Sequence, residues 1–443
     1  MDRLVPAPAT AVSNKRQFVS LEWLRFGLGA YLVLFHTLNG FNYPELPTAI
    51  RKICEMGFFS TSTFFVLSGF LLAHVYLRDH ASGAAAMSGS KKTFWVKRFA
   101  NLYPIHVGSF FLVVAIFAIF PKLGIIPHDK YMSLMSVYPD TNDWKPAVMH
   151  RMSSTELGFA LGMNALLLHA WNPYYLTFNI PSWSISTLMF LYLLFPLVAP
   201  YLHRFKRPGW LLAAICALCL SPAVLFICMD WYGSPATGIL HRNPLVRAPE
   251  FLAGIALCAV YHRQQQLGVV VTRAVLGALW FLVVASILAA AYLLNVAGDF
   301  SQKGNIPYFL LHDGLLLPAQ VALIYVLLHI PNPSQHWAKL AKPLGNCSLS
   351  MFALHIPLFM IFARAERVLD GEPLLCLTDL MGCFAAAGGK TPWHYPIYFA
   401  LVILISLAFQ KHFVERCRRM IERAFLDKKA NARSAQIPEE AKA

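Results

Sequence analysis

The chain has 443 residues, of which 57% are hydrophobic and 13% charged, and its formal net charge is +15. A soluble domain usually carries about 25% charged residues, so this balance excludes an ordinary soluble protein and indicates that lipid is the main solvent. The basic residues lie between apolar runs and do not form one stripe, which argues against a nucleic-acid partner. The length allows about ten membrane-crossing helices of ~20 residues, without a large additional soluble domain.

Apolar runs predict an all-α fold, a polytopic transmembrane bundle of about ten spans. The expected spans are residues 19–39, 57–77, 99–120, 183–202, 210–230, 247–262, 273–294, 307–330, 347–364 and 394–412. A shorter apolar stretch, 155–170, follows a polar loop and is interpreted as an interfacial or re-entrant helix. Counting it as a span would reverse the orientation of every later loop.

Lysine and arginine mark one side of this bundle. In the ten-span arrangement every connection on the side of the N-terminus is basic, whereas the basic residues of the opposite loops are matched by acids. The positive-inside rule therefore predicts cytoplasmic N- and C-termini. We expect a polar cytoplasmic segment at 1–18, without a cleavable signal peptide, and a membrane domain at 19–413. A long external loop at about 121–182 and a basic, partly disordered cytoplasmic tail at 414–443 complete the prediction.

The nine cysteines show no metal-ligand spacing, and we expect no bound metal. Most of them lie in apolar runs, where a free thiol behaves as a small hydrophobe. Cys376 and Cys383 share one predicted external loop, where a disulfide and a pair of free thiols are both open.

The first span carries two ionisable residues, Arg25 and His36, in an otherwise apolar helix. Eleven residues at 100° make three turns plus ~20°, so both lie on one face, about 16 Å apart along the axis. Ionisable groups at membrane depth are costly unless they face a cavity or a partner, which favours a functional site. The alternative is structural: Glu22 and Arg25 would anchor the helix at the interface, and His36 would hydrogen-bond a neighbouring helix.

Further polar residues occur in later spans. Lys97 and Arg98 precede the third span, where a cationic side chain can bind phosphate, anionic lipid, or set topology. At the fourth span, Trp183 suits the membrane interface, and Ser184 and Ser186 can cap the helix or bond a substrate. Three more buried polar residues are interpreted as hydrogen bonders within the bundle: His312, Asp313 and His355.

These residues resemble the acyltransferase-3 family of integral membrane acyltransferases, which includes bacterial polysaccharide O-acetyltransferases. Arg25 and His36 match its Arg-x10-His element. The other segments that resemble family motifs occur in the family's order: FFVLSGFLL (64–72), Arg98 with Leu102 and Pro104, PSWSIS (181–186), RAPEFLAGIAL (247–257), LGNCSLSMFALHIP (344–357) and FVER (413–416). The chain departs from the family pattern at Asn101, Leu188 and Cys417, which stand where a second Arg, a Glu and a Pro are usual.

The resemblance implies transfer of an acyl group, acetyl in the first place, from cytosolic acetyl-CoA or another acyl-CoA to a hydroxyl of a cell-surface or exported glycan. His36 would be the general base or a transient acyl carrier, and Arg25 would orient the donor or stabilise negative charge. Arg98, Lys97 and Asn101 would bind CoA. The acceptor would meet four residues of the fourth span: Trp183, Ser184, Ser186 and Tyr192.

The same resemblance implies a multi-pass protein of the bacterial inner membrane, in contact with lipid and dependent on a separate external transferase partner if transfer is completed outside. Two other classes remain open on the sequence. A transporter or flippase would line its path with Arg25 and His36, although the internal repeats typical of transporters are not evident. A non-catalytic subunit of an envelope-assembly complex would account for Asn101 and Leu188.

Overall fold

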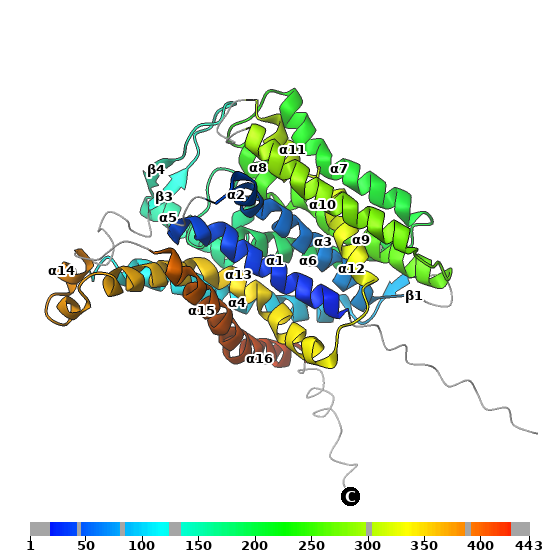
Figure 1. The fold of residues 1–443 in the computed structure, drawn as a ribbon. Helices are drawn as coiled ribbons and strands as arrows, with labels where there is room; N and C mark the ends of the chain where they lie inside the picture. The colour runs from blue at the N-terminus through cyan, green and yellow to red at the C-terminus, as the bar shows by residue number, and fades with distance from the viewer. Residues whose placement is uncertain are drawn as a thin grey trace, which may run out of the picture.

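The computed structural model of the protein describes residues 18–41, 46–79, 85–123, 134–297, 304–385 and 391–426. Within them the chain is an all-α bundle with two short antiparallel hairpins (Figure 1). The hairpins pair Leu77–Asp79 (β1) with Ala85–Met87 (β2), and Leu134–Val137 (β3) with Val148–Arg151 (β4).

Nine segments of the described chain are long and apolar enough to cross a membrane. They are built from the following helices: Thr48–Cys54 (α2) with Gly57–Tyr76 (α3), Lys91–Ile119 (α4), Ile180–Ser182 (η3) with Trp183–His203 (α6), Pro208–Cys228 (α7), Ala236–Arg242 (α8) with Pro244–Gln266 (α9), Arg273–Val296 (α10), Ile306–His312 (α11) with Leu317–Leu328 (α12), Gln335–Leu369 (α13), and Pro392–His394 (η5) with Tyr395–Phe409 (α15), Gln410–Val414 (η6) and Glu415–Leu426 (α16). These nine coincide with the second to tenth expected spans, which confirms the polytopic helical bundle.

The remaining expected span is Val19–Thr37 (α1), which carries Glu22, Arg25 and His36 and is not among those nine. It continues into the short helix Leu38–Phe41 (η1). In Figure 1, α1 lies in the middle of the bundle, where it packs against α13 and α3. The span that carries these three ionisable residues thus lies among other helices and not at the periphery.

Two glycines bring α3 and α9 into direct backbone contact. A Cβ at Gly69 would overlap the carbonyl oxygen of Phe251, and a Cβ at Gly254 would overlap that of Val66. Small residues at such crossings let helices approach closely in lipid, where van der Waals packing drives association. The pair forms the centre of the main core, together with buried residues of α6 and α12.

By contrast, α7 and α10 lie at the outside of the bundle (Figure 1), and few of their side chains are buried. Their exposed residues are nonetheless large and apolar, as at Leu225 and Phe281. Such a face is stable only against hydrocarbon, so α7 and α10 are lipid-facing helices.

The long loop between α4 and α6 contains the β3–β4 hairpin and two short helices, Ser154–Ala165 (α5) and His169–Trp171 (η2). With 12 residues, α5 is about 18 Å long, too short to cross a hydrocarbon core of about 30 Å. The exclusion of 155–170 from the spans is thus confirmed.

Three helices are longer than their apolar runs predict. Ser90 caps α4 by accepting a hydrogen bond from the Thr93 N–H, so this helix begins at Lys91, before the expected span. Polar turns likewise extend α13 at both ends, and α16 continues to Leu426 in the expected tail. Hydropathy detects the part of a helix that meets lipid and misses its polar ends.

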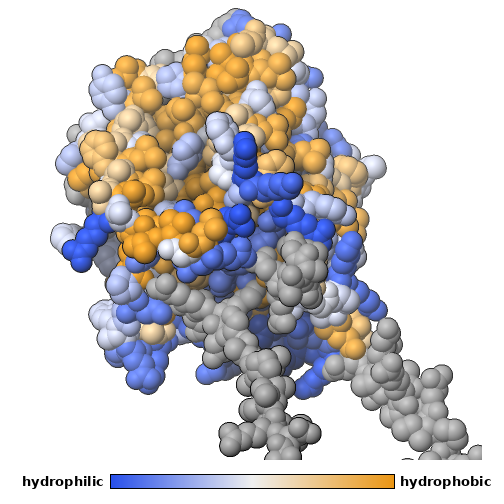
Figure 2. Space-filling model, turned by 90° about the vertical axis from the view of Figure 1, so that its right-hand side faces the viewer, coloured by the Kyte–Doolittle hydropathy of each residue, from blue (hydrophilic) through white to orange (hydrophobic). Residues whose placement is uncertain are grey.

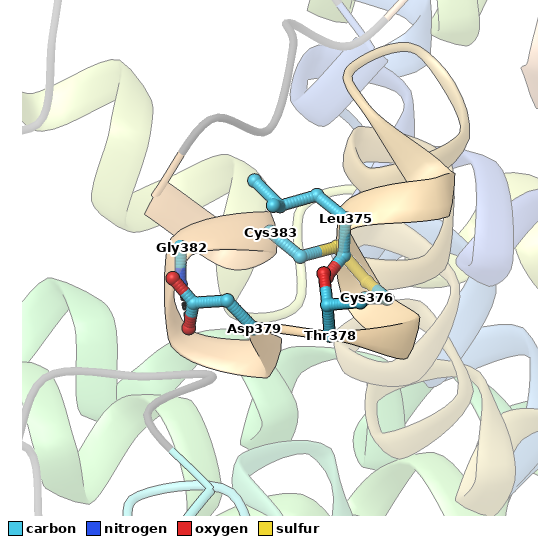
Figure 3. The surroundings of a disulfide bond; sticks show 6 residues. All are labelled: Leu375, Cys376, Thr378, Asp379, Gly382 and Cys383. Carbon is cyan, nitrogen blue, oxygen red and sulfur yellow. Dashed lines mark hydrogen bonds between the residues drawn. A yellow bond between two sulfur atoms is a disulfide. The ribbon is translucent and has the colours of Figure 1, made fainter.

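Cys376 and Cys383 form a disulfide, which decides the question that the sequence left open. The bond joins the short helix Pro373–Leu377 (η4) to Leu380–Ala385 (α14), as Figure 3 shows. Within the same loop, the Asp379 carboxylate accepts a hydrogen bond from the Gly382 N–H at 2.9 Å.

The two ends of the bundle are distinct. β1, β2 and the start of α1 lie at one end, whereas β3, β4 and α14 lie at the other (Figure 1). Figure 2 views the first end, where hydrophilic side chains gather over the lower half below an apolar surface. We call these the Arg25 end and the His36 end, after the residue of α1 nearest to each.

Candidate active site

His36 lies in the last turn of α1, and its ring is oriented by the helix itself. The Nδ1 atom is 2.8 Å from the carbonyl oxygen of Leu32. A carbonyl can only accept, so Nδ1 carries the proton in the neutral imidazole and Nε2 keeps the lone pair. The ring centroid of His355 is 4.9 Å away and that of Phe35 is 4.7 Å away, yet His36 stays accessible. His36 is therefore a neutral imidazole with a basic Nε2 on an accessible side chain.

A cavity of about 280 Å³ lies at the same end of the bundle. Its walls come from the long loop, α8 and α11, and include the side chains of Tyr138, Trp144, His241, His312 and Asp313. His241, in the cavity wall, lies within electrostatic range of His36, so the cavity and the imidazole belong to the same end of the bundle. A mainly apolar wall with a few convergent polar groups is typical of small-molecule sites.

Beside this cavity a buried charge cluster joins three helices. The Arg247 guanidinium is 2.9 Å from the Glu250 carboxylate and 3.4 Å from that of Asp313, and it donates to the Ser62 hydroxyl at 2.8 Å. All three charged side chains are at most 4% exposed. Buried charges persist in proteins only when they are paired in this way, so the cluster fixes α3, α9 and α11 relative to one another.

The residues predicted at the start of α6 have different environments. The ring of Trp183 is 4.7 Å from that of His241, which places Trp183 beside the cavity wall. Ser184 donates to the carbonyl oxygen of Pro181, and Ser186 donates to that of Leu167. Both serines are buried, so their hydroxyls hold the end of the long loop against α6.

His169 strengthens the same junction. Ser182 donates to the carbonyl oxygen of Asn179 at 2.6 Å, and so its hydroxyl oxygen accepts from His169 Nε2 at 3.1 Å. Burial lowers the pKa of His169 to about 3, with a smaller contribution from neighbouring His106. His169 is therefore neutral at physiological pH and acts as a hydrogen-bond donor.

At the other end of α1, Arg25 pairs with Glu22. Arg25 Nη1 is 3.1 Å from Glu22 Oε2, and the two side chains are 27% and 30% exposed. Glu22 lies one turn before Arg25, so this contact directs the guanidinium away from His36. Gly345 of α13 permits the arrangement, because a Cβ there would overlap the Glu22 carboxylate.

Arg98 of α4 and Arg25 of α1 both lie near Tyr192 of α6. The hydroxyl of Tyr192 hydrogen-bonds Ser68 and lies within electrostatic range of both arginines. Arg98 also donates to the Tyr76 hydroxyl at 3.2 Å and stacks over that ring at 5.5 Å, while its Nε is buried without a hydrogen-bond partner. Four helices, α1, α3, α4 and α6, thus present two cations and a phenol to one place.

Lys97 and Asn101, the other residues predicted to bind CoA, are not bonded to this group. Lys97 is exposed and Asn101 half-buried, and neither makes a hydrogen bond to the two arginines in the described part of the chain. Arg25, Arg98 and Tyr192 are therefore the predicted residues that the fold brings together at this end.

Arg247, Glu250 and His241 were not predicted as site residues. The first two occupy positions i and i+3 of the RAPE segment inside an expected span. Ionisable residues at membrane depth are a recognised signal of function, and this signal could have identified them. His241 gave no comparable signal, because it lies at the end of a short helix outside the expected span.

Comparison with known proteins identifies the family. The chain matches the family described as an acyltransferase domain over residues 18–411. It is 26% identical to the acyltransferase MdmB of Streptomyces mycarofaciens over 333 residues, 74% of each chain. It is 25% identical to the peptidoglycan O-acetyltransferase OatA of Listeria monocytogenes over 316 residues, 69% of this chain but 45% of that protein. No solved structure matches. The protein belongs to the acyltransferase-3 family and is a multi-pass membrane acyltransferase.

Proposed function

We propose that the protein transfers an acetyl or other short acyl group from cytosolic acyl-CoA to a hydroxyl of a cell-surface or exported glycan. The observation that carries the proposal is the orientation of His36. Its Nδ1 is bonded to the Leu32 carbonyl, its side chain is accessible, and a cavity large enough for one sugar-sized group lies at the same end of the bundle. An imidazole in this state is suited to accept the proton of an attacking hydroxyl.

The donor would enter at the Arg25 end. Arg98 and Arg25 supply two cations for the CoA phosphates, with Lys97 at the rim and Asn101 one turn along α4. The positive-inside rule favours a cytoplasmic location for this end, and with it cytoplasmic termini and a bacterial inner membrane. The basic residues predicted for that side fit this orientation.

The position of Arg25 and its contact with Glu22 favour donor binding over the other role expected for it. It lies about 16 Å from His36 along the axis of α1, and its contact with Glu22 turns the guanidinium farther away. Arg25 would therefore orient the donor and not stabilise charge on the reacting thioester. An extended pantetheine arm between the helices would carry the thioester from the two arginines to His36.

In the transfer step, His36 Nε2 takes the proton of the acceptor hydroxyl as its oxygen attacks the thioester carbonyl. A C–O bond forms, the C–S bond breaks, and the CoA thiolate leaves and receives the proton from His36. Trp183 and His241 would form the wall against which the acceptor lies, while Ser184 and Ser186 hold the adjoining loop in place.

The test uses membrane vesicles that contain the full-length protein, labelled acetyl-CoA and the native surface glycan. We expect labelled glycan with the wild-type protein and none above background with His36→Gln at equal membrane abundance. Uptake of substrate without covalent labelling would favour transport instead. Glycan labelling that does not require His36 would contradict the proposed base.

A further inference from the structure

Three histidines and one cysteine converge at the Arg25 end, at the ends of α3, α9 and α6. His74 lies in the last turn of α3, Cys258 and His262 lie one turn apart on α9, and His203 ends α6. The ring centroid of Phe18, at the start of α1, is 5.2 Å from that of His74. We call these four residues the His–Cys cluster.

The close crossing of α3 and α9 creates the cluster. Gly69 and Gly254 allow the two backbones to touch. His74 follows Gly69 by just over one turn, and Cys258 follows Gly254 by about one turn. The contacts of His74 and Cys258 with His262 show that side chains of both helices meet in one space at the end of this crossing.

The distances within the cluster match a tetrahedral metal site. His74 Nδ1 is 3.1 Å from His262 Nε2, and Cys258 Sγ is 3.7 Å from the same nitrogen. With Zn–N bonds of about 2.0–2.1 Å and Zn–S bonds of about 2.3 Å, tetrahedral ligands are about 3.3 Å apart for two nitrogens and about 3.6 Å apart for nitrogen and sulfur. The three ligand atoms all lie within 4.8 Å of one another, so one ion can contact all of them.

We propose that His74 Nδ1, His262 Nε2 and Cys258 Sγ bind one divalent transition-metal ion of the Zn²⁺ class. Imidazole and thiolate together suit Zn²⁺, and a water molecule completes the tetrahedron. His74 and Cys258 are buried and His262 is half-buried, so the fourth position opens toward the surface. The ion joins α3 to α9 and is separate from the acyl-transfer site.

His203 contacts the nitrogen of His262 that faces away from the proposed ion. Its Nε2 is 3.0 Å from His262 Nδ1. When His262 Nε2 binds the ion, Nδ1 carries the proton and donates it to His203. Such a partner fixes the tautomer and the ring orientation of a metal-binding histidine. The inclusion of His203 therefore ties α6 to the same ion.

The protons balance in this arrangement. Without metal, the neutral His74 and His262 share one hydrogen bond between Nδ1 and Nε2. On binding, each ring keeps one proton on its other nitrogen, Nε2 of His74 and Nδ1 of His262. Cys258 releases its thiol proton to solvent and binds as thiolate, so one proton leaves for each ion bound.

This site could not be predicted from the sequence, because its ligands come from two helices that lie far apart along the chain. His74 and His262 are 188 positions apart, and Cys258 and His262 alone form a pair at i and i+4. We expected no metal from cysteine spacing, which detects ligands on one short segment and not those that a helix crossing brings together.

The test is the metal content of the full-length protein, purified in detergent without a polyhistidine tag and equilibrated with Zn²⁺ before dialysis. We expect about one Zn²⁺ per chain by elemental analysis. The double variant Cys258→Ser/His262→Gln should retain less than a tenth of it. Cys347→Ser is the matched control, since Cys347 is as fully buried as Cys258 but lies on α13, and it should keep the wild-type content.

Cobalt distinguishes loss of the site from loss of the fold. Co²⁺ in the wild-type site should show tetrahedral visible bands and a thiolate-to-cobalt charge-transfer band, and Cys258→Ser should lose the second while keeping a monodisperse elution profile. His203→Gln should weaken Zn²⁺ binding about 10–100-fold at unchanged stoichiometry. A wild-type protein that holds no Zn²⁺, or a charge-transfer band that survives Cys258→Ser, would overturn the proposal.

Discussion

Polar side chains have different environments at the two ends of α1. At the His36 end, the polar side chains are buried or held by protein: the Leu32 carbonyl orients the imidazole, and Arg247 pairs with Glu250 and Asp313. At the Arg25 end, the two arginines are half-exposed, and Glu22, the partner of Arg25, is exposed to a similar degree. A rigid end suits a reaction that needs one geometry, whereas an open cationic end suits a flexible, multiply charged donor.

The largest effect should follow a change at His36. Replacement by Gln keeps a polar side chain but removes the basic Nε2, and we expect acyl transfer to fall by about 10²–10⁴-fold. Membrane abundance and thermal stability should stay close to wild type.

His329 offers the matched control for this measurement. Its Nδ1 bonds the Tyr325 carbonyl four residues earlier, as His36 Nδ1 bonds that of Leu32. His329→Gln should leave transfer within about threefold of wild type. If the two variants lost activity equally, the helix-bound imidazole would be a structural feature and the distinction between the ends would fail.

The next largest effect should be a loss of stability in Arg247→Met. The change leaves Glu250 and Asp313 buried without their counter-cation, and removal of one partner of a buried pair costs about 3–5 kcal/mol. We expect a clear fall in the thermal unfolding midpoint in detergent. The double variant Arg247→Met/Glu250→Gln should regain part of the lost thermal stability.

The exposed Arg273 at the start of α10 is the control, since Arg273→Met should shift the midpoint little. An Arg247→Met protein as stable as wild type would show that the charge cluster does not hold α3, α9 and α11 together.

At the Arg25 end we expect a binding effect. Arg98→Ala removes a charged hydrogen-bonding group, a loss of about 1.5–3 kcal/mol, and should raise KM for acyl-CoA about 10–100-fold with kcat changed only slightly. Lys97→Ala should raise KM less, because this side chain is exposed, and Lys92→Ala should have no effect. A fall in kcat at constant KM would move Arg98 from donor binding into the chemical step.

The smallest effect concerns the long loop near the His36 end. Hydrogen bonds from Ser153 lower the pKa of Glu156 at the start of α5, with a further contribution from His150. A lowered folded-state pKa means that the stabilising contribution is present above the ordinary Glu pKa and disappears as pH falls through the lowered value. Hydrogen exchange of the α5 amides, corrected for intrinsic rates, should therefore report local loosening in acid.

Glu156→Gln supplies the comparison, because Gln at this position keeps a polar cap but does not titrate. Its α5 amides should show little dependence on acid pH. An equal acid response in both proteins would assign the loosening to another group.

The fold was largely predictable because lipid imposes a simple rule on sequence. Nine expected spans coincide with apolar helices, and α5 is too short to cross, as the short apolar stretch at 155–170 predicted. Helix ends were less predictable: Ser90 caps α4 before the apolar run begins, and α16 is too polar for hydropathy to detect.

The site was predictable only where one helix carries it. Arg25 and His36 share a face of α1, which helical periodicity reveals directly. The cluster of Arg247 with Asp313, and that of His74 with His262, depend on which helices touch. Gly69 and Gly254 decide that contact, and a single sequence does not state which partner a small residue will meet.

The central claim is that an acyl group passes from the Arg25 end to the His36 end. Sealed membrane vesicles of both orientations test it, since acetyl-CoA does not cross the membrane and only inverted vesicles expose the cytoplasmic face. Labelled acetyl-CoA added outside should label glycan enclosed in inverted vesicles, and His36→Gln should abolish that labelling. Labelling of external glycan by right-side-out vesicles supplied with external acetyl-CoA would contradict the account.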